Sequence, residues 1–165
     1  MNQTFRRTEI LIPQGVDMEK WSVVACDQFT AQPEYWAARE RECAGVPSAL
    51  HLMLPEAYLA ERDPMTEAAR INAEMDRYLA EGVFRALPES FVYVERTLQS
   101  GATRRGIVGA LDLEDYDFSP DSASPVRATE GTVASRLPAR VRVREGAALE
   151  MPHTMVFLDD EADRV

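Results

Sequence analysis

The hydrophobic pattern is clearest between Asp63 and Gly82, where apolar residues recur every three or four positions. The residues that repeat in this way are Ala68, Ile71, Met75, Tyr78 and Leu79. This spacing places them on one face of a helix. Asp63 is a favourable N-cap, Pro64 suits the first helical position, and Gly82 suits the position after the end. The pattern therefore predicts a helix over residues 64–81 that packs one face into the core.

A second helix is predicted over residues 33–44, from Pro33 to just before Gly45. Before it, the valine-rich run 21–25 favours a buried strand. Polar residues follow this run directly. In open α/β sheets, residues just after the carboxyl end of a strand often line the ligand crevice. Cys26, Asp27, Gln28 and Thr30 are therefore site candidates, although Asp27 and Thr30 also suit ordinary helix caps and Cys26 a small buried apolar residue.

Two β-rich runs, 91–98 and 105–113, are joined by a turn at Ser100 and Gly101 and predict a hairpin over residues 90–113. Gly106 and Gly109 in the second run leave room for close approach of backbone or ligand, or mark a bulge. Shorter apolar runs at 9–13, 48–54 and 155–158 predict further strands. His51 lies inside one of them, and a hydrogen-bonded core histidine is favoured there over a ligand.

Residues 133–145 are ambiguous. Val141 and Val143 alternate as in a strand, whereas Pro138 and Gly146 suit the start and end of a helix, which we prefer. Taken together, the elements predict a mixed α+β (α/β) fold in which a mixed sheet containing the hairpin is flanked by helices. A length of 165 residues suits a single domain, 1–165. The abrupt finish after the last predicted strand suggests the N-terminal portion of a longer protein.

The charge balance narrows the possible partners. Asp and Glu number 28 against 18 Lys and Arg, giving a net charge of −10 that disfavours nucleic acid and anionic membrane surfaces as partners. No apolar run is long enough to span a membrane and no export signal is present. Cys26 and Cys43 have no metal-binding spacing, which fits the reducing cytoplasm. The acidic run 112–117 matches no EF-hand loop, so a solvated strand end is preferred over a Mg²⁺ or Ca²⁺ site.

Against this acidic background, arginines cluster between residues 127 and 144 around the polar turn 129–132. Guanidinium groups and backbone N–H groups at such a turn suit a phosphate or carboxylate. The residues that would bind this anion are Arg127, Thr129, Gly131, Thr132 and Arg136. Glu130 would act as a general base or Mg²⁺ ligand. Asp27 is a second catalytic candidate and His153 a further binding candidate, if the fold brings them to the same turn. The residues identify no cofactor.

Several linked stretches in order, 24–36, 47–56, 105–117, 127–133 and 151–160, resemble the domain of unknown function 1015 family of prokaryotic proteins. Members are usually longer, so the resemblance implies that this chain is the N-terminal part. Some members are labelled as similar to ParB-like proteins, a superfamily that includes nucleotide-hydrolysing DNA partition proteins and free-serine kinases. Family genes also often neighbour serine-biosynthesis genes. The resemblance carries over no catalytic residue.

These observations leave three hypotheses open. The first is an enzyme domain that binds a phosphorylated metabolite or nucleotide and transfers a phosphoryl group, in a role linked to serine metabolism. The second is a non-catalytic domain whose arginines dock an acidic surface, on the C-terminal part of the same protein or on a second copy. The third is thiol chemistry at Cys26.

Overall fold

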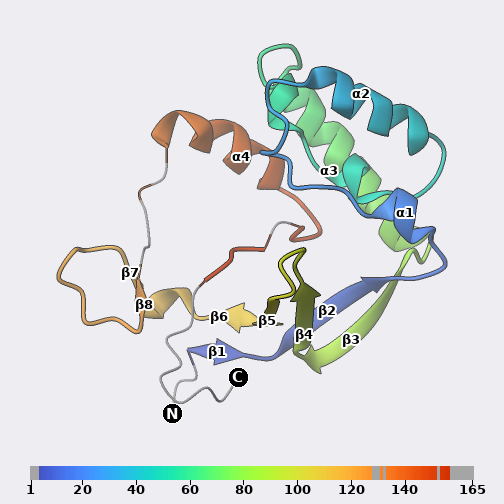
Figure 1. Ribbon diagram of the computed structural model, residues 1–165. Helices are drawn as coiled ribbons and strands as arrows, with labels where there is room; N and C mark the ends of the chain where they lie inside the picture. The colour runs from blue at the N-terminus through green and yellow to red at the C-terminus, as the bar shows by residue number, and fades with distance from the viewer. Residues whose placement is uncertain (1–3, 128–130, 132, 152, 157–165) are drawn as a thin grey trace. The chain divides into compact units, whose positions relative to one another are not determined.

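The computed structural model describes residues 4–127, 131, 133–151 and 153–156, and leaves out the side chains of residues 136, 139 and 140. The chain divides into two compact units. The helical unit comprises Pro13–Arg85 and Thr132–Met155, and the strand unit comprises Met1–Ile12, Ala86–Gly131 and Val156–Val165. Figure 1 labels the elements along the chain.

The helical unit contains α1 (Met18–Trp21), α2 (Pro33–Glu42), α3 (Pro64–Ala80) and α4 (Leu137–Arg144), with 3₁₀ turns η1 (Ala49–Leu52), η2 (Glu56–Tyr58) and η4 (Ala134–Arg136). The helices predicted over 33–44 and 64–81 are thereby confirmed. The ambiguous segment 133–145 is also helical, because α4 continues directly from η4 and is followed by Gly146 at φ 81°. This is the left-handed conformation that a glycine adopts readily after a helix.

Helix α3 begins and ends as its sequence predicts. The side chain of Asp63 accepts a hydrogen bond from the Thr66 N–H at 2.9 Å, and Gly82 follows the helix at φ 70°. Ala68, Ile71, Met75 and Tyr78 are buried. The prediction was wrong for Leu79, which is 41% exposed because it lies at the edge of the apolar stripe.

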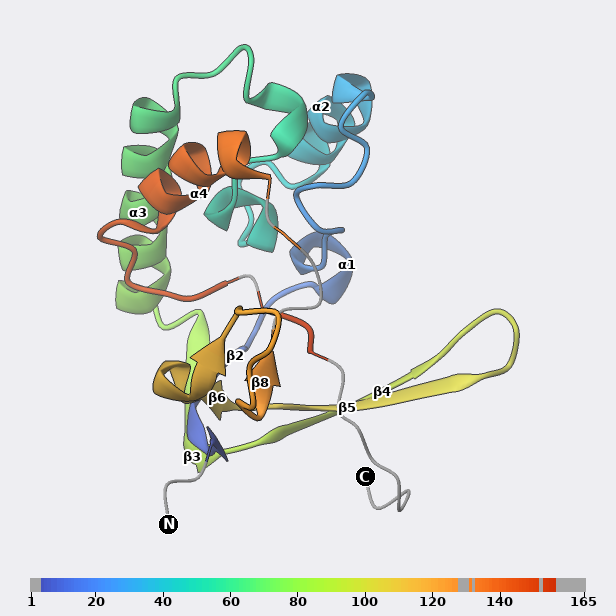
Figure 2. The same cartoon turned by 90° about the vertical axis from the view of Figure 1, so that its left-hand side faces the viewer.

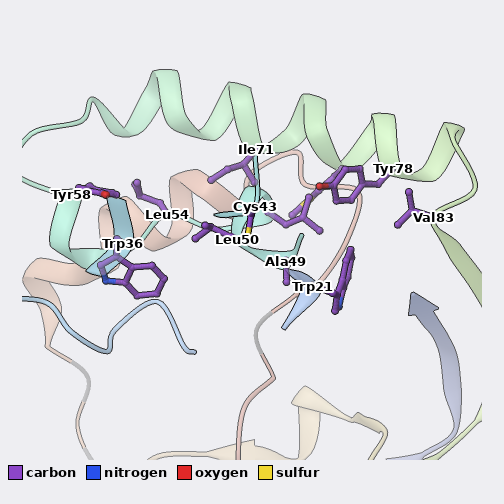
Figure 3. Close-up of a cluster of buried hydrophobic side chains, with 12 residues drawn as sticks. Trp21, Trp36, Cys43, Ala49, Leu50, Leu54, Tyr58, Ile71, Tyr78 and Val83 are labelled. Atoms are coloured by element: carbon purple, nitrogen blue, oxygen red, sulfur yellow. The ribbon is translucent and has the colours of Figure 1, made fainter. Parts of the chain in front are cut away.

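The core of the helical unit lies along the apolar face of α3 (Figure 3). Trp36 from α2 is fully buried, and its indole N–H donates to the carbonyl of Gln28 at 3.2 Å, so the polar end of the ring is also satisfied. The buried cluster contains Trp21, Trp36, Cys43, Ala49, Leu50, Leu52, Leu54, Tyr58, Ile71, Met75, Tyr78 and Val83.

Two apolar runs that were predicted to be strands have other structures. Asp17 caps a helical turn that ends at Trp21, and residues 22–25 have no strand partner, so the predicted strand 21–25 is wrong. In the run 48–54, Ser48 accepts a hydrogen bond from the Leu50 N–H and starts η1 instead of a strand. A short apolar run predicts burial in both cases, but not the backbone conformation. Of the predicted last strand, residues 155 and 156 are described and have no regular structure.

The strands are short and pair two by two. They are β1 (Phe5–Arg6), β2 (Thr8–Pro13), β3 (Phe84–Ser90), β4 (Val92–Thr97), β5 (Thr103–Val108), β6 (Ala110–Leu111), β7 (Tyr116–Asp117) and β8 (Val126–Arg127). The pairs are β1 with β6, β2 with β3, β4 with β5, and β7 with β8, the last of these parallel. Helices and strands together confirm the mixed α+β class, although the described strands form two-stranded sheets rather than one larger mixed sheet.

The predicted hairpin is confirmed as β4 and β5, antiparallel from Val92 opposite Val108 to Thr97 opposite Thr103. The turn is closed by a hydrogen bond of 2.8 Å from the Leu98 N–H to the Ala102 carbonyl, with Gly101 at φ 84°. Figure 2 shows the hairpin as a long ribbon that carries its turn away from β6 and β8.

In the acidic run after the hairpin, carboxylates accept hydrogen bonds from nearby backbone N–H groups. Asp112 accepts a hydrogen bond from the Glu114 N–H at 3.1 Å and caps the 3₁₀ turn η3 (Leu113–Asp115), and Asp117 accepts from the Ser119 N–H at 2.9 Å. The described residues contain no group of three or more His, Cys, Asp or Glu side chains placed to hold a metal ion. They also contain no helix of the length and apolarity needed to cross a bilayer.

Gly109, between β5 and β6, is a point of close approach. A Cβ at this position would lie 2.7 Å from Phe5 Cζ and 2.8 Å from the Arg6 carbonyl oxygen. The Phe5 and Phe91 rings stack over it at 5.4 Å between centroids. Gly106 differs, because a Cβ there would meet nothing within 4 Å.

We therefore predict that Gly109→Ala lowers the free energy of unfolding by about 1–3 kcal/mol, because the added methyl group overlaps backbone as well as side chains. The matched control is Gly106→Ala, which adds the same group in open space and is expected to stabilise the protein by about 0.4–1 kcal/mol. Urea unfolding measures both values. Equal effects of the two substitutions would contradict the close approach at Gly109.

Candidate functional site

The candidate site begins at Ser48, which is fully buried. Its hydroxyl donates to the carbonyl of Lys20 at 2.7 Å and accepts from the N–H of Leu50 at 3.2 Å. These two hydrogen bonds fix the start of η1 against the end of α1. His51 is the third residue of η1 and is thereby turned toward α3.

Tyr78 of α3 connects η1 to the core. Its hydroxyl accepts from the Ser48 N–H at 2.9 Å and lies 2.8 Å from His51 Nδ1. Its ring packs on the rings of Trp21 and Phe84, with centroids 6.1 and 6.4 Å away. Burial raises the pKa of Tyr78 to about 12, so the hydroxyl keeps its proton at neutral pH.

Charged residues one turn apart on α3 surround the imidazole of His51. Glu74 Oε1 lies 3.7 Å from His51 Nδ1, and Glu74 Oε2 accepts from Arg77 Nε at 2.9 Å. Arg70 donates to the His51 carbonyl at 3.1 Å and to Glu67 at 3.0 Å. The hydrogen bond from Arg77 is the main cause that lowers the pKa of Glu74, so this carboxylate stays ionised at neutral pH.

The surface is hollowed at this point. A depression of about 410 Å³ is lined by Gly45, Val46, His51, Arg70, Glu74 and Arg77. A second depression of about 340 Å³ shares His51 and Arg70 and extends toward Glu40, Arg62 and Glu67. Both depressions are open to solvent and belong to the helical unit.

Burial lowers the pKa of His51, an effect that Glu74 opposes and that the guanidinium groups of Arg70 and Arg77 reinforce. The ring is therefore neutral at pH 7. The Tyr78 hydroxyl has three acceptors for its proton: His51 Nδ1 at 2.8 Å, the Ser48 carbonyl at 3.4 Å, and the carboxylate of Glu74. We take the 2.8 Å contact with Nδ1 as the preferred one. From this pattern we assign Nδ1 as an acceptor, which leaves the ring proton on Nε2.

The depression has more cationic and neutral donors than carboxylates: Glu74 is the carboxylate in its lining, and Arg77 already donates to it. This balance suits an anion. An Nε2–H donor would stand beside the guanidinium groups of Arg70 and Arg77 on the wall of one depression. Neutral donors and arginines together bind phosphate or carboxylate oxygens through charge-assisted hydrogen bonds. With its proton on Nε2, the neutral ring presents a donor to the depression, and Nδ1 is its basic nitrogen.

The predicted anion turn is only partly within the described residues. Arg127 is exposed at the end of β8, opposite Asp117 of β7, and Gly131 is exposed as well. Arg136 is the last residue of η4, and its side chain lies outside the description, as do Thr129, Glu130 and Thr132. His153 is exposed without regular structure. Arg127 belongs to the strand unit, whereas Asp27 and His153 belong to the helical unit, so their convergence stays a prediction.

The Cys26–Thr30 loop differs from both interpretations of its sequence. It follows no strand, and neither Asp27 nor Thr30 caps α2, since the N-cap is Gln32 without a side-chain hydrogen bond. Asp27 is exposed and accepts from the amide of Gln28 at 3.3 Å. Phe29 has φ 49° and stacks on Tyr35 at 4.3 Å. This ring contact stabilises a backbone conformation that is uncommon outside glycine.

Sequence reasoning missed the residues of α3 that line the depression. Arg70, Glu74 and Arg77 are spaced at four and three positions and so share one helical face. That spacing is also typical of a solvated face, and the sequence had no means of placing His51 beside it. For His51, the favoured interpretation was a hydrogen-bonded core residue. The hydrogen bond is present, but the ring is only partly buried and lines both depressions.

We predict that His51 makes stability depend on pH. Its pKa in the folded chain is below the ordinary value of 6.5, so the unfolded chain binds a proton that the folded chain does not. The stabilisation is present above pH 6.5 and is lost as the pH falls through the folded pKa. His51→Gln should flatten this part of the curve, measured by urea unfolding between pH 7.5 and 5. His153→Gln, at the exposed histidine, is the control, and an unchanged slope in His51→Gln would contradict the assignment.

Comparison with known proteins finds a match to one protein family. No curated protein and no solved structure matches the chain. The sequence does match the family described as Protein of unknown function (DUF1015) over residues 11–165. This match spans nearly all of the helical unit and the strand unit. It agrees with the resemblance drawn from the linked sequence stretches, and the chain belongs to the DUF1015 family.

Proposed function

We propose that this chain binds a small phosphorylated molecule, a metabolite or nucleotide, in the depression around His51. The observation that carries the proposal is that His51, Arg70 and Arg77 line one depression of about 410 Å³. Phosphate oxygens would accept hydrogen bonds from the imidazole Nε2–H and from the arginines. Arg70 would then share its guanidinium group between the ligand and Glu67, which it already contacts at 2.9 Å.

Phosphoryl transfer is the reaction class that we propose for such a ligand, with serine or phosphoserine as the substrate class. The support is the resemblance of family members to proteins that act on nucleotides and serine, together with a neutral histidine donor at the depression. The turn from Arg127 to Arg136 remains a second proposed anion site, with Glu130 and Asp27 as candidate catalytic residues. Arg127 is exposed, as this role requires. A cytoplasmic location belongs to the same proposal.

Isothermal titration of the chain with inorganic phosphate, ADP, phosphoserine and serine tests the proposal. At least one phosphorylated compound should bind, and Arg70→Gln should weaken it about tenfold or more, because a charge-assisted hydrogen bond is lost. Arg41→Gln is the matched control, since Arg41 is exposed on α2 and lines neither depression. Arg127→Gln reports on the second proposed anion site in the same titration.

The titrations of the two variants distinguish the depression from the turn as the anion site. Loss of binding in Arg70→Gln alone supports the depression, and loss in Arg127→Gln alone moves the anion site to the turn. If the chain binds none of the four compounds, ligand binding by this chain is rejected.

A non-catalytic docking role is the second candidate, and the observation behind it is that the arginines at the depressions are already engaged within the chain. All three described arginines that line the depressions have carboxylate partners: Arg62 lies 2.8 Å from Glu40, Arg70 lies 2.9 Å from Glu67, and Arg77 lies 2.7 Å from Glu81. Charges paired in this way usually form a solvated face. The docking surface would then be the arginine-rich turn predicted around residues 127–132, and Arg127→Ala and Glu130→Ala alter assembly with a partner and leave any turnover by the full protein unchanged.

A further inference from the structure

The register of the β4–β5 hairpin sorts its side chains onto two faces, because directly opposite residues point to the same side. One face, here called the arginine face, carries Val92 opposite Val108, Val94 opposite Gly106, and Arg96 opposite Arg104. The other face carries Tyr93 opposite Ile107, Glu95 opposite Arg105, and Thr97 opposite Thr103.

The charged groups of the second face satisfy one another. The Tyr93 hydroxyl donates to Glu95 at 2.8 Å, and Arg105 Nε lies 3.4 Å from the same carboxylate oxygen. These hydrogen bonds lower the pKa of Glu95 and keep it ionised. This face therefore has its charge compensated within the hairpin.

The arginine face is not compensated. Within the residues that the structure covers, neither Arg96 nor Arg104 has an ion pair or side-chain hydrogen bond, although the chain as a whole is strongly acidic. Like charges directly opposite each other destabilise a two-stranded pair. An acidic group beside them on the same face would reduce this repulsion and gain charge-assisted contacts.

The same face also has an uncovered apolar position. Val94 is 44% exposed, and its cross-strand neighbour Gly106 has no side chain to cover it. A Cβ at Gly106 would meet nothing within 4 Å, so the space above this glycine is open. A side chain arriving from the β5 side can therefore reach across Gly106 and contact Val94.

The outer edge of β5 is also unpaired among the described strands, because β5 pairs with β4 alone. Residues 103–105 on this edge are exposed. A two-stranded hairpin is marginally stable in water, and a third strand adds both backbone hydrogen bonds and cross-strand contacts.

We propose that the hairpin is a docking site for an extended acidic segment of a partner protein, which adds as a third strand along β5. Its acidic side chains lie on the arginine face beside Arg104, one strand spacing away, and the long side chain of Arg96 extends toward them from the next strand. An apolar side chain two positions along, on the same face of the added strand, crosses Gly106 and covers Val94. This site is separate from the depression around His51 and does not depend on ligand binding there.

Two other partners fit less well. A second hairpin docked face to face would bring four arginines together, since each copy contributes Arg96 and Arg104. Nucleic acid supplies no backbone groups for the open strand edge, and the net charge of −10 repels it. An acidic polypeptide satisfies both the charge and the strand edge.

Fluorescence anisotropy with labelled peptides tests the proposal. Peptides of about eight residues are long enough to form one strand. In the acidic peptide, glutamate and valine occupy one face and threonine the other, and in the matched peptide lysine replaces glutamate. The wild-type chain should bind the acidic peptide at least about tenfold more tightly than the lysine peptide. The double variant Arg96→Glu/Arg104→Glu should reverse this preference, a gain of binding that misfolding cannot produce.

Gly106→Val provides a test independent of charge. It should weaken the acidic peptide about tenfold by filling the open space, while urea unfolding shows no loss of stability. The control Arg41→Glu/Arg85→Glu makes the same change in net charge at two exposed arginines outside the hairpin and should keep the wild-type preference.

Three results would overturn the proposal. They are equal binding of the two peptides by the wild-type chain, loss of the preference in the control variant, and self-association in sedimentation experiments that Arg96→Glu/Arg104→Glu abolishes. The last of these would assign the arginine face to a second copy of the chain. Failure of phosphate binding at Arg70 would leave all the expected peptide results unchanged.

Discussion

The hydroxyl of Tyr78 joins parts of the helical unit that are far apart in sequence. It stands at the end of a fully buried side chain, where a polar atom without a partner would cost about 1–3 kcal/mol. Ser48 supplies an N–H at 2.9 Å and His51 supplies a ring nitrogen at 2.8 Å, so the oxygen is satisfied on both sides. The same two hydrogen bonds hold η1 against α3, and they orient the imidazole that borders both depressions.

Helix α3 therefore has two roles on two adjacent faces. Its apolar face, with Ile71, Met75 and Tyr78, forms the core of the helical unit. The neighbouring face, with Arg70 and Glu74, borders His51. Because both faces belong to one rigid helix, packing of the core sets the distance between His51 and the charges around it. A ligand that binds at the depression would draw its donors from groups already held in position, which lowers the entropic cost of binding.

The sequence predicted the parts of the fold that depend on local rules. Asp63, Pro64 and Gly82 define both ends of α3, and Ser100 and Gly101 define the hairpin turn, because capping and turn chemistry act over a few residues. The runs 21–25 and 48–54 were assigned incorrectly, since short apolar runs predict burial but not backbone conformation. The depression could not be predicted from the sequence for a different reason. His51 meets α3 through contacts with residues 23 and 27 positions away, and no local pattern encodes such a pairing.

The protonation state of His51 is central to this account, because a neutral ring with its proton on Nε2 is what makes the depression a donor site. The ¹⁵N chemical shifts of the imidazole, recorded by NMR at pH 7 with and without inorganic phosphate, test this directly. We expect a neutral ring with Nδ1 as the hydrogen-bond acceptor and an Nε2 resonance that moves when phosphate is added. A ring protonated on Nδ1, a charged imidazolium, or an Nε2 resonance that phosphate leaves unchanged would contradict the account.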